Sequence, residues 1–530
     1  MANTRRRFPY FLSIIVLSAI LGGIFGPRIE VAAAASDEDG VRASLKTFTK
    51  FYQLIEENFA DTLVPDKAIY KGAVPGMLRT LDPHSNFFDP RDFQLLREEQ
   101  KGHYYGVGMQ VQPRNGKTIV LAPFAGSPAY RAGLRPGDVI IEVNDKKTDN
   151  LNTTEVADLL KGPRGTPVQI VIMRDGVEKP LTFNVIRDEI SRKSVQDGLW
   201  LKSGVAYVDI DQFNENTSHE LEAALKGLGE NSIKGLIVDL RENPGGLLNE
   251  GVAVADKFLT KGQTIVSHRG RASAEKTYTA RHGNGGRDYP IVVLVNRYSA
   301  SAAEIVAGAL QDHDRAWILG DNTFGKGLVQ TVYPLAENSG LALTTAKYYT
   351  PSGRLIQRDY TNTSFFDYYY RKDTATRNPL DVKMTEGGRT VYGGGGIAPD
   401  EQYSPPKWDK FQSDLIRKYA FFNFTKHYFG NREAKLPKGW SPDEALVTEF
   451  HDFLLKQPEI KFTEAEFTQT HDWIKQNLQR EMYTTAFSLD ESRKFTIEND
   501  PMVIRAIDSL PKAKALLEST KKMLVQRMTK

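Results

Sequence analysis

The sequence predicts a multidomain α/β protein, and three observations support this prediction. Short apolar runs alternate with helical patterns over residues 189–400, which indicates a largely parallel sheet in a layered core. A β-rich stretch at residues 99–188 precedes that core. Helical patterns flank the two at residues 36–98 and 401–530, and residues 1–35 read as an export segment.

Composition excludes several function classes. A chain of 530 residues has room for about two to four domains and for an enzyme core. The net charge of +3 gives no reason to expect a nucleic-acid partner. The absence of cysteine excludes disulfides, a thiol nucleophile and cysteine-ligated zinc.

The N-terminal segment predicts export. Arg5–Arg7 precede an apolar run at Phe8–Phe25, and the small residues at Val31–Ser36 are typical of a signal-peptidase site. The run is about as long as the shortest spanning helices, ~17–20 residues, so a cleaved signal and an uncleaved inner-membrane anchor both stay open. In both cases we expect a periplasmic or other extracytoplasmic location for the bulk of the chain.

Residues 36–98 have helical spacing, with apolar side chains recurring between Phe48 and Phe59 and again between Ile69 and Leu78. A turn is expected at Leu81–Ser85. We expect His84 to be a turn or capping residue, because no second ligand lies at metal-binding spacing.

The β-rich stretch has a recognisable order of elements. A short helix follows Ser127 and ends at Gly133, a strand covers Val139–Asn144, a second helix covers Thr153–Leu160 and a further strand covers Val168–Met173. This order and the string A-G-L-R-P-G-D-V-I strongly resemble a PDZ domain.

The PDZ resemblance implies a peptide-binding loop at Gly106, Val107, Gly108 and Met109, whose backbone amides would grip a C-terminal carboxylate. The alternative is an ordinary turn at the entry to a strand. A nucleotide-binding loop is disfavoured, because the G-x-G-x-x-G spacing is absent.

The core over residues 189–400 is expected to contain several strands, with helices at 217–228 and up to Phe258. The expected strands cover Gly204–Ile210, Lys234–Arg241, Thr264–Ser267, Ile291–Val295, Trp317–Leu319 and Val329–Leu335.

The C-terminal region after a hinge at Pro405–Pro406 is helical, with runs such as Phe411–Phe422 and Met502–Met528. Two interpretations stay open. The region is a module that packs on the catalytic domain, or the helical ends form a surface for a homo-oligomer or an adaptor.

Two stretches of the core carry candidate chemistry. After Ile291–Val295 the chain breaks into small residues, and helical spacing resumes just after Ser301, while Lys326 lies between two glycines further on. A hydroxyl at a helix start and a returning lysine are the parts of a Ser-Lys site. Taken locally, Ser301 and Glu304 also form a capping box, and Lys326 is typical of a solvated loop lysine.

The string D-L-R-E-N-P-G-G at residues 239–246 has two interpretations as well. It is a tight turn into the next helix, or its glycine Gly246 lets a backbone amide approach a substrate oxygen. In the second case the amide of Ala302, at the positive end of its helix, would complete an oxyanion hole.

Together with the PDZ-like stretch, these motifs resemble the carboxyl-terminal processing (tail-specific) serine proteases, over nearly all of residues 48–400. The string G-G-G-I-A-P-D at 394–400 belongs to the resemblance. It implies a ClpP/crotonase-like layered α/β protease core with an inserted PDZ domain. It also implies a serine-type endopeptidase that needs no cofactor or metal and acts on proteins with apolar C-terminal tails.

The resemblance assigns roles to five positions. The nucleophile is Ser301, the base is Lys326 and Gln330 orients the lysine, while Gly246 and Ala302 form the oxyanion hole. A lysine is a base only when neutral, yet its usual pKa is about 10.4, so we expect Lys326 in an enclosed place where burial lowers that pKa. On a strand, Gln330 would share a face with Lys326.

Other chemistries are weaker. A Ser-His-Asp triad would draw on His268, His282 or His313, none of which stands in a triad motif. A metallohydrolase is disfavoured because His219-Glu220 lacks the second histidine of H-E-x-x-H. A non-catalytic PDZ scaffold and an acyl-CoA enzyme of the related layered fold remain as alternatives from other classes.

Overall fold

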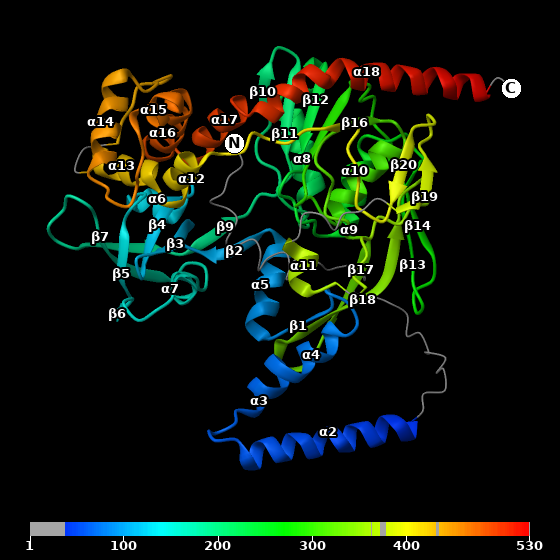
Figure 1. Ribbon diagram of the computed structural model, residues 1–530, viewed down its shortest axis with the longest axis horizontal. Coiled ribbons are helices and arrows are strands. Elements are labelled where there is room, and N and C mark those ends of the chain that lie inside the picture. Colours follow the sequence, from blue (N-terminus) through cyan, green and yellow to red (C-terminus); the bar gives the residue numbers. More distant parts are fainter. Residues whose placement is uncertain (1–37, 362, 371–377, 431–433, 529–530) are drawn as a thin grey trace. The chain divides into compact units, whose positions relative to one another are not determined.

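The computed structural model describes residues 38–361, 363–370, 378–430 and 434–528 (Figure 1). The predicted export segment at residues 1–35 lies outside the described residues. Within the described ranges, no helix has the length and apolarity needed to cross a bilayer. The described chain forms two compact units, one of residues 102–193 and 404–508 and the other of the remainder.

The second unit is built on a six-stranded sheet that confirms the predicted parallel strands. Its order is β10-β11-β12-β15-β16-β21, with parallel pairing from β11 to β21 and an antiparallel edge at β10. The strands are β10 (Leu199–Lys202), β11 (Val205–Asp209), β12 (Gly235–Asp239), β15 (Ile291–Val295), β16 (Ala316–Gly320) and β21 (Glu401–Gln402).

Three helices cover this sheet: α8 (Thr217–Gly227), α9 (Leu248–Asp256) and α10 (Ala302–Asp312) (Figure 1). Every residue of β12 and β15 is buried. This agrees with their continuous apolar sequences, which are typical of parallel strands covered on both faces. The apolar side chains of the strands and helices form one core cluster, and all residues of α10 are buried within it or beside it.

A second, antiparallel sheet departs from the prediction of a largely parallel core. Its strands are β1 (Asn86–Phe88), β13 (Thr264–Arg269), β14 (Lys276–Thr279), β17 (Leu328–Pro334) and β18 (Gly340–Tyr349). The segments predicted at 264–267 and 329–335 are strands, but they pair antiparallel here. Periodicity identifies a strand and not its partner, and the unpredicted β18 is the strand that pairs with three of the others.

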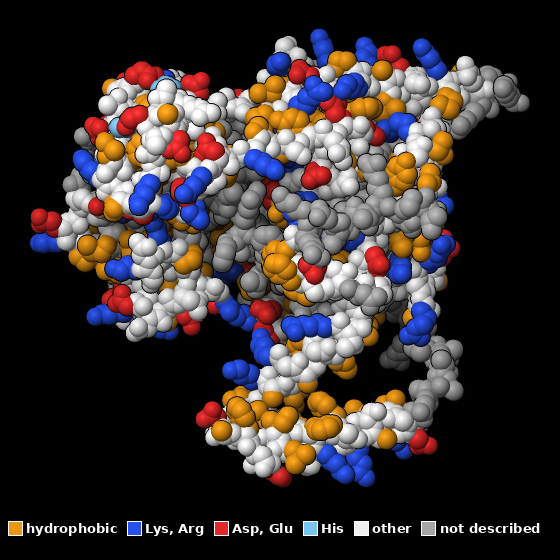
Figure 2. Space-filling model, in the orientation of Figure 1, with side chains coloured by type: hydrophobic (Ala, Val, Ile, Leu, Met, Phe, Trp, Pro, Cys, Tyr) orange, Lys and Arg blue, Asp and Glu red, His pale blue; other side chains and the backbone are white. Residues whose placement is uncertain are grey.

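Further helices and strands complete this unit. The predicted helix near Phe48–Phe59 is α2, which carries exposed apolar side chains along its length (Figure 2). The C-terminal part of α18 packs on the parallel sheet, with Leu510 against Gly235. The elements are α2 (Glu38–Asn58), α3 (Pro65–Ala68), η2 (Ile69–Ala73), α4 (Val74–Arg79), α5 (Pro90–Lys101), η3 (Glu230–Ser232), η4 (Ala336–Asn338), α11 (Phe365–Tyr370), β19 (Asn378–Met384), β20 (Thr390–Gly393) and α18 (Pro501–Met528).

The first unit contains the PDZ-like segment, an antiparallel sheet in the order β3-β4-β5-β7-β8 with β6 paired to β5. The two predicted helices are confirmed as α6 and α7, the latter begun by a capping box from Asn152. The elements are β2 (His103–Gly106), β3 (Met109–Arg114), β4 (Lys117–Pro123), α6 (Pro128–Ala132), β5 (Val139–Val143), β6 (Lys146–Lys147), α7 (Thr153–Leu160), β7 (Pro167–Met173), β8 (Leu181–Ile186) and β9 (Asp188–Ser191).

The same unit contains six helices from the C-terminal region; five of them pack around an aromatic core that includes Phe421, Phe450 and Trp473, and the sixth, α17, packs on α16. The predicted run Phe411–Phe422 is two helices, because the chain turns at Tyr419, where φ is 55°. The helices are α12 (Lys410–Arg417), α13 (Ala420–Phe429), α14 (Glu444–Leu455), α15 (Glu464–Gln469), α16 (His471–Ala486) and α17 (Leu489–Glu498).

This helical group packs on the PDZ-like segment within its unit. Arg114 of β3 donates a hydrogen bond to Asn423, and its guanidinium lies 5.3 Å from the ring centroids of both Tyr419 and Phe422. The module was expected to pack on the catalytic domain, but these contacts are to the PDZ-like segment, and it is the C-terminal part of α18 that packs on the catalytic core. The oligomer or adaptor surface stays an untested prediction.

Candidate active site

Ser301 stands at the junction of β15 and α10 in a conformation that is unusual for a residue with a side chain. Its φ is 55° and its ψ is −114°, and the residue is half-buried. A non-glycine residue with positive φ persists only where its surroundings hold it, and such strain is common at catalytic turns. The preceding residue is tied down, because Ala300 donates its N–H to the carbonyl of Asn243 at 2.9 Å.

The neighbouring serine, Ser299, has a structural task. It is fully buried, its hydroxyl donates to the carbonyl of Leu240 at 2.7 Å, and it accepts the N–H of Asn296 at 2.9 Å. Both bonds fix the turn that follows β15. Ser301 is therefore the serine of this turn that is available for chemistry.

Lys326 lies in the segment between β16 and β17 and is enclosed, with 3% of its surface exposed. Its Nζ makes no hydrogen bond among the described residues. Burial lowers the pKa of Lys326 from 10.5 to about 7, while the carboxylates of Asp82 and Glu304 oppose that shift. A large share of the amine is therefore neutral near pH 7, as a general base requires.

The hydroxyl of Tyr348 connects the two candidate residues. It lies 3.1 Å from the carbonyl oxygen of Ser301 and 2.5 Å from that of Lys326, and the tyrosine is 1% exposed. Residues that are distant in sequence are thereby brought to one point of the core. The sequence did not single out Tyr348, because a tyrosine in a β-strand has no local mark of this role.

Gln330 is buried near the start of β17, and its amide nitrogen donates to the hydroxyl of Thr344 at 3.0 Å. It makes no hydrogen bond to Lys326 in this structure, since Nζ of that lysine has no partner within the described chain. Lys326 and Gln330 were expected to lie on one face of a strand. Lys326 instead precedes β17, and the register of that strand shifts between Val329 and Gln330.

The glycine pair at the end of the D-L-R-E-N-P-G-G string lies against the turn that carries Ser301. A Cβ atom added to Gly245 would lie 2.7 Å from Cβ of Ser301 and 3.0 Å from the nitrogen of Ala302. Gly246, with φ of 141°, bridges to Phe213. Ala302 is the first residue of α10, where N–H groups have no intrahelical acceptor. The geometry thus brings together the two loops predicted to form an oxyanion hole.

The turn Asp82–Ser85 is a part of the site that the sequence did not identify. The Asp82 carboxylate accepts the N–H groups of His84 and Ser85, and the Ser85 hydroxyl accepts the N–H of Thr344 in β18. His84 is in the predicted turn, but its ring is buried, and burial together with the charges of Lys326 and Arg358 lowers the pKa of His84 well below its usual range. Only the fold brings this turn to the lysine.

The hydrogen bonds around His84 indicate its protonation. Gln357 accepts the N–H of Gly327 through Oε1 at 2.8 Å, so its Nε2 is the group that donates to the Tyr368 hydroxyl at 3.0 Å. The Tyr368 hydroxyl also lies 2.8 Å from Nε2 of His84, where a neutral imidazole can accept its proton. Because burial lowers the pKa of His84, its neutral form is favoured, and that form adds no positive charge beside Lys326.

An aromatic wall encloses the same region. The guanidinium of Arg358 lies 3.7 Å from the ring centroid of Phe324 and 4.3 Å from that of Tyr368, and all three side chains are buried. Stacking of this kind replaces part of the water that a cation loses on burial. The wall packs against His84, whose ring centroid lies 6.3 Å from that of Phe324 and 5.4 Å from that of Tyr368.

Two comparisons with known sequences identify the family. Residues 204–363 match the model of peptidase family S41, and residues 119–174 match that of the PDZ domain. The chain is 39% identical over 357 residues to the carboxy-terminal-processing protease of Bartonella bacilliformis, covering 66% of this chain and 80% of that protein. This chain is a carboxy-terminal processing protease of peptidase family S41. It is also 32% identical over 373 residues to the carboxy-terminal processing protease CtpB of Bacillus subtilis, covering 68% of this chain and 76% of that protein.

Among solved structures, the photosystem II D1 C-terminal processing protease is 30% identical, with a TM-score of 0.36, over 67% of this chain and 87% of that one. The family and domain matches of the sequence show that this enzyme is a serine-type protease with a PDZ domain, as predicted. The roles of its individual residues remain predictions.

The PDZ loop Gly106–Met109 joins β2 to β3 in this protease. The carbonyl of Val107 accepts the N–H of Ala129 at 2.8 Å, and the carbonyl of Gly108 accepts the hydroxyl of Ser127 at 2.7 Å. Gly108 has φ of 76°, and a Cβ there would lie 2.6 Å from Cβ of Ser127. The loop is therefore held in a fixed shape that only glycine fits at this position.

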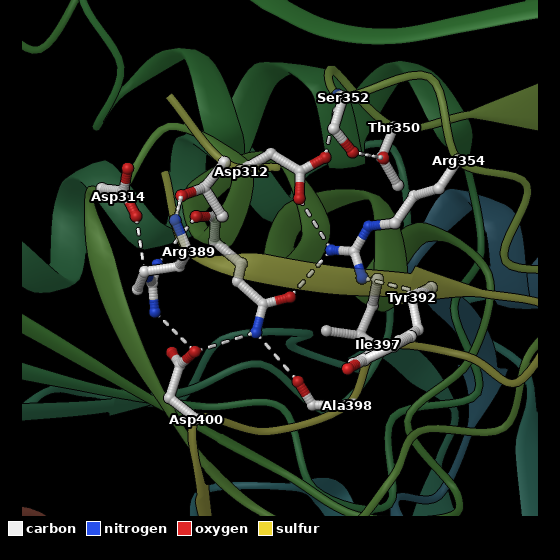
Figure 3. Close-up of polar contacts among 12 residues, drawn as sticks. Asp312, Asp314, Thr350, Ser352, Arg354, Arg389, Tyr392, Ile397, Ala398 and Asp400 are labelled. Carbon is white, nitrogen blue, oxygen red and sulfur yellow. Dashed lines mark hydrogen bonds and ion pairs between the residues drawn. The ribbon is translucent and has the colours of Figure 1, made fainter. Parts of the chain in front are cut away.

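The far end of α10 is anchored by a buried ionic network (Figure 3). Asp312 accepts Nη2 of Arg354 at 2.7 Å and the N–H of Ser352 at 3.0 Å, and Arg354 is fully buried. The segment that follows returns to the lysine, because Arg358 donates its N–H to the carbonyl of Gly325 at 3.0 Å. The helix that begins after Ser301 is thereby fixed at its C-terminal end. No cluster of potential metal ligands occurs among the described residues.

Proposed function

We propose that this carboxy-terminal processing protease cleaves peptide bonds with a Ser-Lys dyad, Ser301 as nucleophile and Lys326 as general base. The observation that carries the proposal is the enclosed lysine, whose pKa burial lowers to about 7, joined through Tyr348 to a serine with strained backbone. Serine is a weak nucleophile until a base takes its proton, and a lysine with a pKa of about 7 is in large part neutral near pH 7.

The proposed steps are those of acyl transfer through a serine nucleophile. Neutral Lys326 takes the proton of Ser301, whose oxygen attacks the scissile carbonyl, and the amides of Gly246 and Ala302 stabilise the oxyanion. Collapse expels the amine, which takes the proton back from the lysine and leaves an acyl-enzyme. Water, deprotonated by the same lysine, releases the acid. Gln330 orients the amine once substrate closes the site, since catalytic hydrogen bonds often form only in the complex.

Recognition of substrates through their C-terminal tails is assigned to the PDZ domain. Its strand β3 is an edge of the sheet, so a peptide can add to it as a further strand. The terminal carboxylate would bind the amides of Gly106–Met109. Apolar tails of flexible proteins are the expected substrates.

We also propose that the enzyme works in the periplasm or another extracytoplasmic space, exported by its N-terminal segment or anchored by it. The support is the run of Arg5–Arg7 followed by the apolar Phe8–Phe25. Detection of the protein in the cytoplasm of cells that express the full chain would contradict this location.

A cleavage assay tests the dyad. The substrate is an unstructured protein with an apolar C-terminus, incubated with wild type, Ser301→Ala and Lys326→Ala. Both variants should lose cleavage while still binding the tail, whereas Ser299→Ala, which removes only bonds that fix the turn, should keep part of the activity. Full activity of Lys326→Ala would contradict the dyad. Loss of activity in Ser299→Ala but not in Ser301→Ala would assign the role of nucleophile to Ser299 instead.

A further inference from the structure

We propose that Glu304 is the positioning residue of the dyad, a buried carboxylate that fixes the backbone of Ser301 and of Lys326 to a single oxygen atom. The inference rests on the proposed Ser-Lys function. Glu304 is fully buried in the first turn of α10. Its Oε2 accepts the N–H of Ser301 at 2.9 Å and the N–H of Lys326 at 2.8 Å.

These contacts go beyond helix capping. A capping glutamate accepts the N–H of the N-cap residue three positions earlier, which here is Ser301. Glu304 in addition accepts the N–H of Gly325 at 2.7 Å and the hydroxyl of Thr323 at 2.5 Å through Oε1. The three extra donors lie between 19 and 22 positions downstream, in the segment that carries the lysine.

The partners of Glu304 indicate that it is bound as an anion. An ionised carboxylate has about four lone-pair sites, and four donors occupy them. Thr323 also donates its proton here, because its oxygen accepts the N–H of Ile397 at 2.6 Å. Burial raises the pKa of Glu304, and the four hydrogen bonds oppose that effect.

The position of the lysine depends on this tie. Gly325 has φ of 84°, and the segment from Thr323 to Gly327 lies outside any strand, so regular sheet pairing does not hold Lys326. The bonds to Glu304 act together with those from the N–H of Phe324 to the carbonyl of Ser299 and from the hydroxyl of Tyr348 to the carbonyl of Lys326. Glu304 is the side chain whose carboxylate binds the backbone N–H groups of both Ser301 and Lys326.

The negative charge of Glu304 has a second, measurable consequence. The charged and titratable groups around Lys326 are Asp82 and Glu304, whose carboxylates raise its pKa against the effect of burial, together with His84 and Arg358. Removal of one carboxylate therefore lowers the pKa of the lysine further. The acid limb of the pH–rate profile, where the amine becomes neutral, should move to lower pH.

The test compares Glu304→Gln with the matched control Glu220→Gln. Glu220 is in α8 of the same unit, and its Oε2 accepts the N–H and hydroxyl of Ser194 and the N–H of Val195. Each substitution replaces a carboxylate that accepts several hydrogen bonds. Only Glu304 accepts hydrogen bonds from residues of the dyad. The substrate is a fluorogenic peptide with an apolar C-terminus.

Glu304→Gln should lower kcat on the order of 10²-fold, since about 1 Å of misplacement costs that much, leave KM unchanged and shift the acid limb to lower pH. Glu220→Gln should change neither kcat nor the limb. Unchanged kcat in Glu304→Gln, or a lower kcat with the limb in place, would overturn the inference.

Thr323→Val keeps the charge of Glu304 and removes the hydroxyl that donates to its Oε1. This variant tests the inference if Glu304→Gln fails to fold. It should lower kcat and leave the acid limb where it is, and an unchanged kcat would overturn the inference. Failure of the proposed Ser-Lys dyad can be distinguished from failure of the proposed role of Glu304. If Lys326→Ala is fully active the proposed function fails, whereas an inactive Lys326→Ala with a fully active Glu304→Gln refutes only the role of Glu304.

Discussion

Replacement of Lys326 by methionine should abolish cleavage and stabilise the protein. The lysine is 3% exposed, and its amine makes no hydrogen bond among the described residues. Methionine fills a similar volume without a charge. The wild-type enzyme therefore gives up stability to keep a base in an apolar place.

The size of the effect follows from the pKa of Lys326, which burial lowers from 10.5 to about 7. Between these two pH values the unfolded chain binds the proton and the folded chain does not, so the contribution of this lysine to stability rises with pH. At pH 7 and below, the cost of burying the lysine is on the order of 4 kcal/mol, and it disappears as the pH approaches the unfolded value. The gain from Lys326→Met should follow the same course.

The gain in stability of Lys326→Met is measured by scanning calorimetry at several pH values between about 6 and 10, from the unfolding transition of the unit that contains the parallel sheet. At pH 7 the melting temperature of Lys326→Met should exceed that of wild type by roughly 5–10 °C, and the difference should shrink toward pH 10. Lys226→Met, at a lysine with 69% of its side chain exposed, should change little. A Lys326→Met protein no more stable than wild type at pH 7, or a gain that grows with pH, would refute the reasoning.

Two glycine substitutions test the oxyanion loop and the PDZ loop. Gly245→Ala would place Cβ 2.7 Å from Cβ of Ser301 and should reduce kcat at least on the order of 10²-fold. The control is Gly229→Ala, also at positive φ but with open space around it. It should lower stability by only about 1 kcal/mol and leave activity unchanged. Equal activities in a peptide-cleavage assay would contradict the placement of the loop. Gly108→Ala should weaken binding of an apolar C-terminal peptide in calorimetric titration and leave labelling of Ser301 by a fluorophosphonate intact, while Gly116→Ala, in open space, should bind normally. Undiminished tail binding by Gly108→Ala would argue against this loop as the carboxylate site.

Local patterns in the sequence were sufficient for much of the fold and for the parts of the site that lie on single motifs. The apolar run of β15 and the helical spacing after Ser301 predicted the turn that presents this serine. The two helices of the PDZ segment were predicted from their turn residues, and Gly133 ends α6 at φ of 89° as a C-terminal cap.

What the sequence could not predict depends on contacts between distant residues. The antiparallel sheet is held together by β18, and no local pattern shows that β17 turns back to pair with it. The Ser85 hydroxyl accepts the N–H of Thr344 from 259 positions away, so a segment predicted only as a turn is buried near the lysine. Glu304 was visible as a helix cap, but its bonds to the segment of Lys326 exist only in the folded chain.

The central claim, that Lys326 activates Ser301, is tested most directly by the rate at which a fluorophosphonate modifies Ser301 as a function of pH. In the wild type the rate should rise with a midpoint near the lysine pKa of about 7 and then level off. Lys326→Ala should label at least on the order of 10²-fold more slowly and without that midpoint. The same rate and the same midpoint in both proteins would contradict the claim.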